Sequence, residues 1–192
     1  MNSMDRGPGA AAEFLNAEFT RRNFLKATGI GAFALSASSI LPSGCAEYEA
    51  APAELRVLNA KEYRIFLAAA ATFLPPLGEG DPTVEDVHAA EYIDAALGLT
   101  RREVQDQVKQ ALAVFEHAPP LFDLRFSRFT KLSAEDRFSV LASWRDSSLG
   151  FRRQLYKALR NLAYASYYSA ESVWKSIDYD GPRYRDPNRS TR

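Results

Sequence analysis

The sequence contains one cysteine and two histidines among its 192 residues. A single cysteine, Cys45, cannot form a disulfide within the chain. It also cannot supply a haem attachment motif, a Cys-rich zinc site or an iron–sulfur cluster. Basic and acidic residues number 24 each, so the net charge is zero and the basic field of a nucleic-acid-binding protein is lacking. These absences favour a binding or accessory protein over a self-sufficient metalloenzyme.

Motifs for nucleotide cofactors and for nucleophilic catalysis are also lacking. The sequence contains no G-x-G-x-x-G or G-K-[ST] phosphate loop and no G-x-S-x-G nucleophile elbow. The stretch from Glu85 to His88 reads Glu-x-x-His, but a di-iron site needs a second copy, and His117 has Val114 three residues before it. We therefore interpret this stretch as a solvated helix face. We predict no catalytic, cofactor-binding or metal-binding residue in this chain.

The N-terminal segment has a charge pattern typical of an address signal. Four basic residues in residues 1–26 are followed by residues 27–46, which carry no charge. The pattern resembles a twin-arginine export signal, which the translocase would read from Arg21, Arg22, Phe24, Leu25 and Lys26. An ordinary amphipathic N-terminal helix is the alternative interpretation. Because the twin-arginine route carries folded proteins, the signal implies export after folding, either alone or with a folded partner.

The residues before Cys45 resemble a bacterial lipobox, except that Pro42 stands where that motif has leucine. Cys45 is therefore a candidate for lipidation. Cleavage near Ala46 or Ala53 is the alternative and would discard it. We divide the chain into a signal segment (1–45), a linker (46–58), a helical domain (59–182) and a flexible, polar C-terminal tail (183–192).

Helix signals recur throughout the domain, and no window shows the alternation of a β-strand. Asn59 caps a first helix that Pro75 ends, and Thr83 with Asp86 begins a second that Gly98 ends. Further expected helices are one that begins at the capping box of Thr100 to Glu103 and ends near His117, one from Ser133, one with an apolar stripe from Phe151 to Ala165, and a short one over 171–177. The expected fold is an all-α compact bundle of five or six helices with an extended C-terminal tail.

Two segments are candidate partner surfaces. The first alternates aromatic and basic residues, with Arg125 and Arg128 among Phe122, Phe126 and Phe129. Such alternation can bind single-stranded nucleic acid, but we expect a helix that buries its phenylalanines and exposes its arginines, with a protein partner as the second choice. Arginine and aromatic residues are enriched at interface hot spots.

The second segment holds five large aromatic residues between Tyr164 and Tyr179. We assign Tyr164 and Trp174 mainly to the core, and we expect Tyr167, Tyr168 and Tyr179 on a partner-binding surface. Gly181 and Pro182 end the helical region. The candidate partner interface consists of Arg125, Arg128, Tyr167, Tyr168, Trp174, Tyr179, Gly181 and Pro182.

Together, several features resemble the gluconate 2-dehydrogenase subunit 3 family. They are the twin-arginine signal, a first helix ending in Phe73-Leu-Pro-Pro76, the stretch from Val87 to Leu97, and the closing run from Leu162 through Trp174 to Pro182. The family contains the small subunits of periplasmic, membrane-associated dehydrogenases of sugars and sugar acids. The resemblance implies a small subunit without assigned chemistry. It also implies that FAD is carried by a partner flavoprotein of the glucose–methanol–choline (GMC) type, and that a cytochrome c subunit often accepts the electrons.

We therefore expect a non-catalytic subunit that binds, co-exports and stabilises such a flavoprotein by a hitchhiker mechanism. The expected location is the periplasm, with membrane association through the N-terminal segment or a lipidated Cys45. The alternative is a stand-alone exported or lipid-anchored helical binding protein of the cell envelope. A small enzyme in its own right would need converging polar groups in a pocket, to which no motif points.

Overall fold

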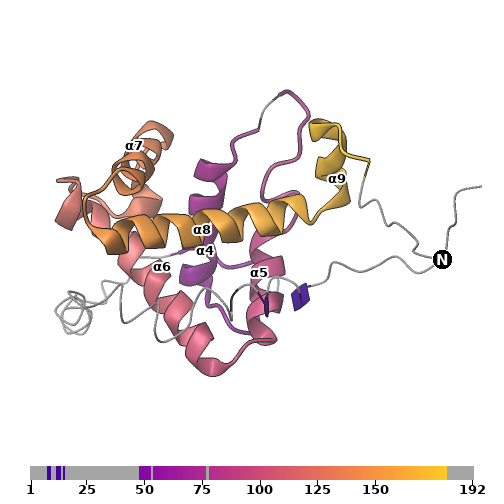
Figure 1. The fold of residues 1–192 in the computed structure, drawn as a ribbon, viewed down its shortest axis with the longest axis horizontal. Coiled ribbons are helices and arrows are strands. Elements are labelled where there is room, and N and C mark those ends of the chain that lie inside the picture. Colours follow the sequence, from indigo (N-terminus) through magenta and orange to yellow (C-terminus); the bar gives the residue numbers. More distant parts are fainter. Residues whose placement is uncertain are drawn as a thin grey trace, which may run out of the picture.

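The computed structural model describes residues 48–180, apart from 53 and 77, together with residues 8, 9, 12, 13 and 15. Within this part every regular element is helical, which confirms the predicted all-α class. The long helix α8 (Gly150–Tyr168) crosses α4 (Ala60–Phe73), as Figure 1 shows. Helices α5 (Ala89–Gly98) and α6 (Arg102–Phe122) also pack on α4. The remaining elements are the 3-10 turn η1 (Phe129–Lys131), α7 (Ala134–Arg145), α9 (Glu171–Trp174) and η2 (Lys175–Ile177).

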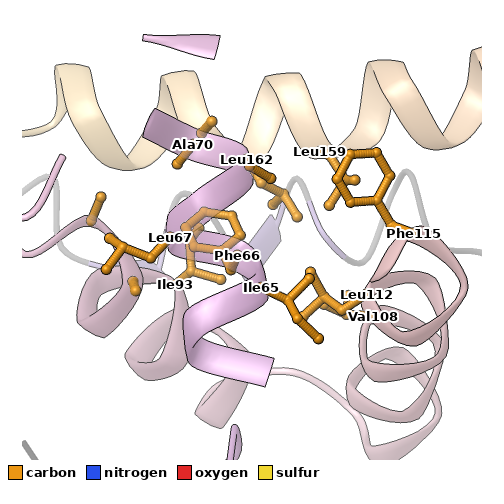
Figure 2. Close-up of a cluster of buried hydrophobic side chains, with 14 of the residues drawn as sticks. Ile65, Phe66, Leu67, Ala70, Ile93, Val108, Leu112, Phe115, Leu159 and Leu162 are labelled. Carbon is orange, nitrogen blue, oxygen red and sulfur yellow. The ribbon is translucent and has the colours of Figure 1, made fainter. Parts of the chain in front are cut away.

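Helix α4 forms the centre of the molecule, and none of its 14 residues is exposed. Its start is set by a complete capping box, in which the Asn59 side chain accepts from the Glu62 amide and the Glu62 carboxylate accepts from the Asn59 amide, each at 2.9 Å. Figure 2 shows the apolar core around it. The core residues labelled there are Ile65, Phe66, Leu67 and Ala70 of α4, Ile93 of α5, Val108, Leu112 and Phe115 of α6, and Leu159 and Leu162 of α8.

The second and third helices begin at other residues than the sequence predicted. Thr83 and Asp86 exchange side-chain and backbone hydrogen bonds as predicted, but they close a turn instead of a helix. His88, with φ of 52°, then separates this turn from α5. At the third helix, the Thr100 hydroxyl donates to the carbonyl of Leu97, so the predicted cap is absent and Arg101 precedes α6 without a side-chain cap.

Helix α6 also continues through Pro119 and Pro120, where the sequence predicted its end. Proline removes an amide donor, which normally ends or kinks a helix. Here the last turn remains packed because Ala118 and Pro119 are buried, and the Pro119 carbonyl accepts the amides of Asp123 and Arg125 at 3.0 and 3.1 Å. Packing therefore compensates for the missing donors.

The described part of the predicted linker is attached to the domain by side-chain contacts. The Tyr48 hydroxyl donates to Glu116 at 2.8 Å, and Arg64 donates to the carbonyls of Glu49 and Ala50. Near its end, the buried carboxylate of Asp94 accepts three successive amides, those of residues 56, 57 and 58, at 2.7–2.9 Å. The chain is thereby held against α5 and α6 before α4 begins.

Two residues that precede the predicted export motif belong to the core. Ala12 is 5% exposed, and Leu15 is fully buried within the hydrophobic cluster. Among the described residues, none of the helices combines the length and hydropathy needed to cross a bilayer.

The three amides held by Asp94 give a first prediction. Asp94→Asn keeps the size of the side chain but replaces one accepting oxygen with a donor that faces amide groups. We expect the free energy of unfolding in urea to fall by about 3 kcal/mol, because buried donors lose a charged acceptor. Asp106→Asn, at an exposed position of α6, is the matched control and should change it little. Equal stability of the two variants would contradict the assigned role of Asp94.

Candidate functional site

A cluster of aromatic side chains occupies the C-terminal end of α8. The rings of Tyr164 and Tyr167 each pack edge-on against Tyr168, with centroids 5.8 and 5.3 Å apart. Trp174, at the end of α9, packs edge-on against Tyr179 at 5.4 Å, and its indole donates to the Tyr168 carbonyl at 3.0 Å. These contacts join the end of α8 to α9 and η2. We call this region the aromatic end.

The aromatic end surrounds a small hollow of about 150 Å³. Its walls come from two segments that are distant in sequence, namely the end of α4 with the loop after it, and the α8–α9–η2 region. The lining residues are Phe73, Leu74, Pro75, Asp81, Tyr164, Tyr167, Tyr168, Val173, Ser176 and Ile177. The lining is therefore mixed, with apolar side chains beside tyrosine hydroxyls, one serine and one carboxylate, a composition that suits a protein side chain with a polar group.

The structure reverses two sequence assignments in this cluster. Tyr167, predicted at the surface, is only 8% exposed, and its hydroxyl donates to the Pro82 carbonyl at 2.7 Å. Burial raises the pKa of Tyr167 above its usual value. Tyr164, predicted in the core, is 40% exposed, as is Ile177, and Tyr179 is 39% exposed. The accessible side chains of the aromatic end are therefore Tyr164, Ile177 and Tyr179, with Tyr168 partly buried between them.

The two candidate interface arginines lie away from the aromatic end and are occupied within the chain. Arg125 pairs with Asp136 of α7. Arg128 is 3.4 Å from the Glu116 carboxylate, and its guanidinium lies 4.5 Å from the centre of the Tyr48 ring. Both arginines belong to the connection between α6 and α7, which packs at the N-terminal end of α8. The structure therefore divides the candidate interface between opposite ends of α8.

In the aromatic–basic segment, the exposure of Phe126 and the pairing of the two arginines differ from our prediction. It is a loop leading into η1 instead of a helix. Phe129 is buried as expected, but the Phe126 side chain is fully exposed while both arginines are paired. The reason is that Phe129 packs against Phe115 in the core, with ring centroids 4.4 Å apart, whereas Phe126 lies on the turn before it.

A buried carboxylate that the sequence analysis missed organises this end of the molecule. Glu116 of α6 is fully buried and accepts the Tyr48 hydroxyl, the Thr130 hydroxyl and the Thr130 amide at 2.6–3.0 Å. Burial, reinforced by the hydrogen bond to Glu116, raises the pKa of Tyr48 to about 12. No motif marks such a residue, and a lone glutamate near a helix end usually indicates a solvated face. These contacts join the chain before α4 and the start of η1 to α6.

The histidines show no arrangement for metal binding. His88 is exposed, and its side chain lies 3.5 Å from Glu91. His117 lies 3.2 Å from the Lys61 ammonium group. Over the part of the chain that the structure describes, no group of three potential metal-ligating side chains occurs. Glu85 and His88 are exposed as predicted, but they lie in the turn before α5 and not on a helix face.

Several predicted functional residues lie outside the described part of the chain. They are the export-signal residues Arg21, Arg22, Phe24, Leu25 and Lys26, the candidate lipidation site Cys45, and the interface candidates Gly181 and Pro182. Their assignments stay predictions.

His117 gives a prediction for pH dependence. Burial, followed by the nearby Lys61 charge, lowers the pKa of His117 below 6.5. The folded state therefore binds fewer protons than the unfolded state as the pH falls below 6.5, and folding stability decreases. We expect the free energy of unfolding, measured in urea at several pH values, to fall less steeply between pH 7 and pH 5 in His117→Gln than in the wild type. An unchanged slope in His117→Gln would contradict the assignment.

Comparison with known proteins identifies the domain that carries these features. The family model described as gluconate 2-dehydrogenase subunit 3 matches residues 60–181, which include every helix from α4 to α9. No curated protein and no solved structure gave a significant match. Because the family model covers more than half of the sequence and the whole of the described helical bundle, the chain belongs to the gluconate 2-dehydrogenase subunit 3 family.

Proposed function

We propose that this protein is a non-catalytic small subunit that binds, co-exports and stabilises a FAD-dependent dehydrogenase of sugars or sugar acids. The observation that carries the proposal is the family match, which begins at the first residue of α4 and continues past η2. The family match therefore covers the whole helical domain and not a fragment of it. In this proposal FAD and the oxidation chemistry belong to a partner flavoprotein of the GMC type, and a cytochrome c subunit takes the electrons.

The aromatic end is the surface we assign to that partner. Tyr164, Ile177 and Tyr179 are each about two-fifths exposed and border a preformed hollow. Aromatic side chains contribute a large contact area at low entropic cost, and interface hot spots tend to fill such hollows. The rigid backing of α8 and the Trp174–Tyr179 contact fix these groups before binding, which reduces the ordering cost of association.

Export is the second part of the proposal. The residues around Arg21 and Arg22 provide the export signal, and the folded helical domain provides the surface that binds the partner. A partner without its own signal would then cross the membrane bound to this subunit, and the complex would reside in the periplasm.

The docking surface is tested by isolating the tagged full-length chain from its native cell. We expect the wild type to retain a stoichiometric flavoprotein that gives the eluate flavin absorbance. The double variant Tyr164→Glu with Ile177→Glu should lose at least about tenfold of this partner, because two charges enter an apolar contact. The matched control is Leu124→Asp with Phe126→Asp, which alters exposed apolar residues at the opposite end of α8 and should retain the partner.

Two results would contradict the proposed function or its surface. A colourless, solitary wild-type chain would favour the stand-alone envelope protein instead. If the aromatic-end variant retains the flavoprotein and the control variant loses it, the interface lies at the other end of the molecule.

Export is tested with Arg21→Lys and Arg22→Lys in one chain. The substitution preserves charge, but lysine lacks the planar guanidinium that distinguishes the twin-arginine motif. We expect both this subunit and the flavoprotein to remain in the cytoplasm, measured by cell fractionation and immunoblotting. Arg101→Lys with Arg102→Lys, at exposed positions of the folded domain, is the control. Periplasmic flavoprotein despite the signal change would refute hitchhiking while leaving the docking surface intact.

A further inference from the structure

An exposed apolar segment lies at the end of the molecule opposite the aromatic end. We call it the apolar loop, and it consists of Leu121, Phe122, Leu124 and Phe126. Their side chains are 70, 39, 85 and 105% exposed, respectively. Single exposed apolar residues are common on soluble proteins, but four large ones within six positions form a patch of the kind that contacts another phase or molecule.

The apolar loop is held in place by the fold. The Pro119 carbonyl accepts the amides of Asp123 and Arg125, and Phe122 packs edge-on against Trp144 with centroids 6.5 Å apart. Leu124 has φ of 52°, a left-handed conformation that is costly for a leucine. The surrounding contacts therefore stabilise a strained turn, and in this turn Leu124 and Phe126 face solvent.

The charged groups that contact this segment are neutralised within the chain. Asp123 accepts from Arg152 at 2.8 Å, Arg125 pairs with Asp136, and Arg128 faces Glu116. The segment consequently combines exposed apolar side chains with internally compensated charges. An anionic or zwitterionic lipid surface would meet no unpaired carboxylate among these contacts.

The point where the N-terminal segment joins the domain lies at this same end. Tyr48 hydrogen-bonds to Glu116 and lies beneath Arg128, which is two residues from Phe126 in sequence. The chain that precedes Tyr48 includes residues 27–46, which contain no charged side chain, and Cys45 is three residues away. Three residues of extended chain span about 10 Å at most. A lipid on Cys45 would therefore hold a bilayer close to Tyr48, on the side of the domain where Arg128 and the connection between α6 and α7 lie.

We propose that the apolar loop is a membrane-contact surface, with Leu124 and Phe126 inserted into the interfacial region of a lipid bilayer. A lipid surface suits projecting side chains better than a protein does, because protein hot spots fill pockets and Phe126 contacts no wall of its own chain. Helix α8, about 28 Å long at 1.5 Å per residue, separates this end from the aromatic end. Both surfaces can be occupied together, and the proposal does not depend on the partner's identity.

The experiment uses the full-length chain with Cys45→Ala, which removes both the lipidation site and the native thiol. Phe126→Cys in this background is labelled with an environment-sensitive fluorophore and mixed with phosphatidylethanolamine–phosphatidylglycerol vesicles. Emission should shift to the blue and be quenched by nitroxide-labelled lipid. Tyr164→Cys, labelled in the same way at the aromatic end, is the matched control and should show neither change.

A second measurement removes the apolar side chains. Leu124→Asp with Phe126→Asp, also with Cys45→Ala, should reduce partitioning onto the same vesicles by at least about tenfold. Tyr164→Glu with Ile177→Glu should leave partitioning unchanged. Because Leu124 and Phe126 are exposed, helix content by circular dichroism should stay at the wild-type level.

Three outcomes would overturn the proposal. The label at position 126 could stay in water while the chain binds vesicles, partitioning could be unaffected by the two aspartates, or the chain could fail to bind vesicles. A label at 126 that responds to the flavoprotein and not to lipid would assign the apolar loop to a protein partner instead.

Discussion

The packing of four helices around α4 is the constraint on which the rest of the structure depends. A helix with no exposed residue must be surrounded, and α5, α6, α7 and α8 all pack against it. Polar residues at its start are accommodated by specific partners, with Glu62 completing the capping box and Lys61 facing His117. Because α8 lies across this central helix and extends past it in both directions, its two ends lie on opposite sides of the molecule (Figure 1).

Buried carboxylates connect the irregular segments to this helical core. Asp94 holds residues 56–58, Glu116 holds Tyr48 and Thr130, and Asp123 binds Ser143, Trp144 and Arg152. A buried carboxylate is stable only with several donors, so each one requires its segment to be in place. The chain before α4 and the connection between α6 and α7 are thereby attached to the helical core, and these contacts position the apolar loop.

The two ends suit two kinds of contact. At the aromatic end, side chains from two distant segments converge on a hollow, which favours a protein partner. At the other end, a strained turn projects apolar side chains beside the point where the N-terminal segment joins the domain. A subunit with this arrangement would stand between a bilayer and an enzyme, holding the enzyme at a fixed distance and orientation.

The sequence alone was sufficient for the fold class, the positions of most helices and the family. Helix periodicity and the caps at Asn59 and Ser133 are local properties, and both caps are present in the structure. Where the sequence prediction was wrong, packing between distant segments outweighed local preference. Pro119 is retained in α6 because it is buried, and Tyr167 turns inward because its hydroxyl reaches Pro82, 85 residues away. Likewise, only the tertiary structure decided that Phe129 would fill the core and Phe126 would face solvent, because Phe129 packs against Phe115 of α6 while Phe126 lies on the turn before it.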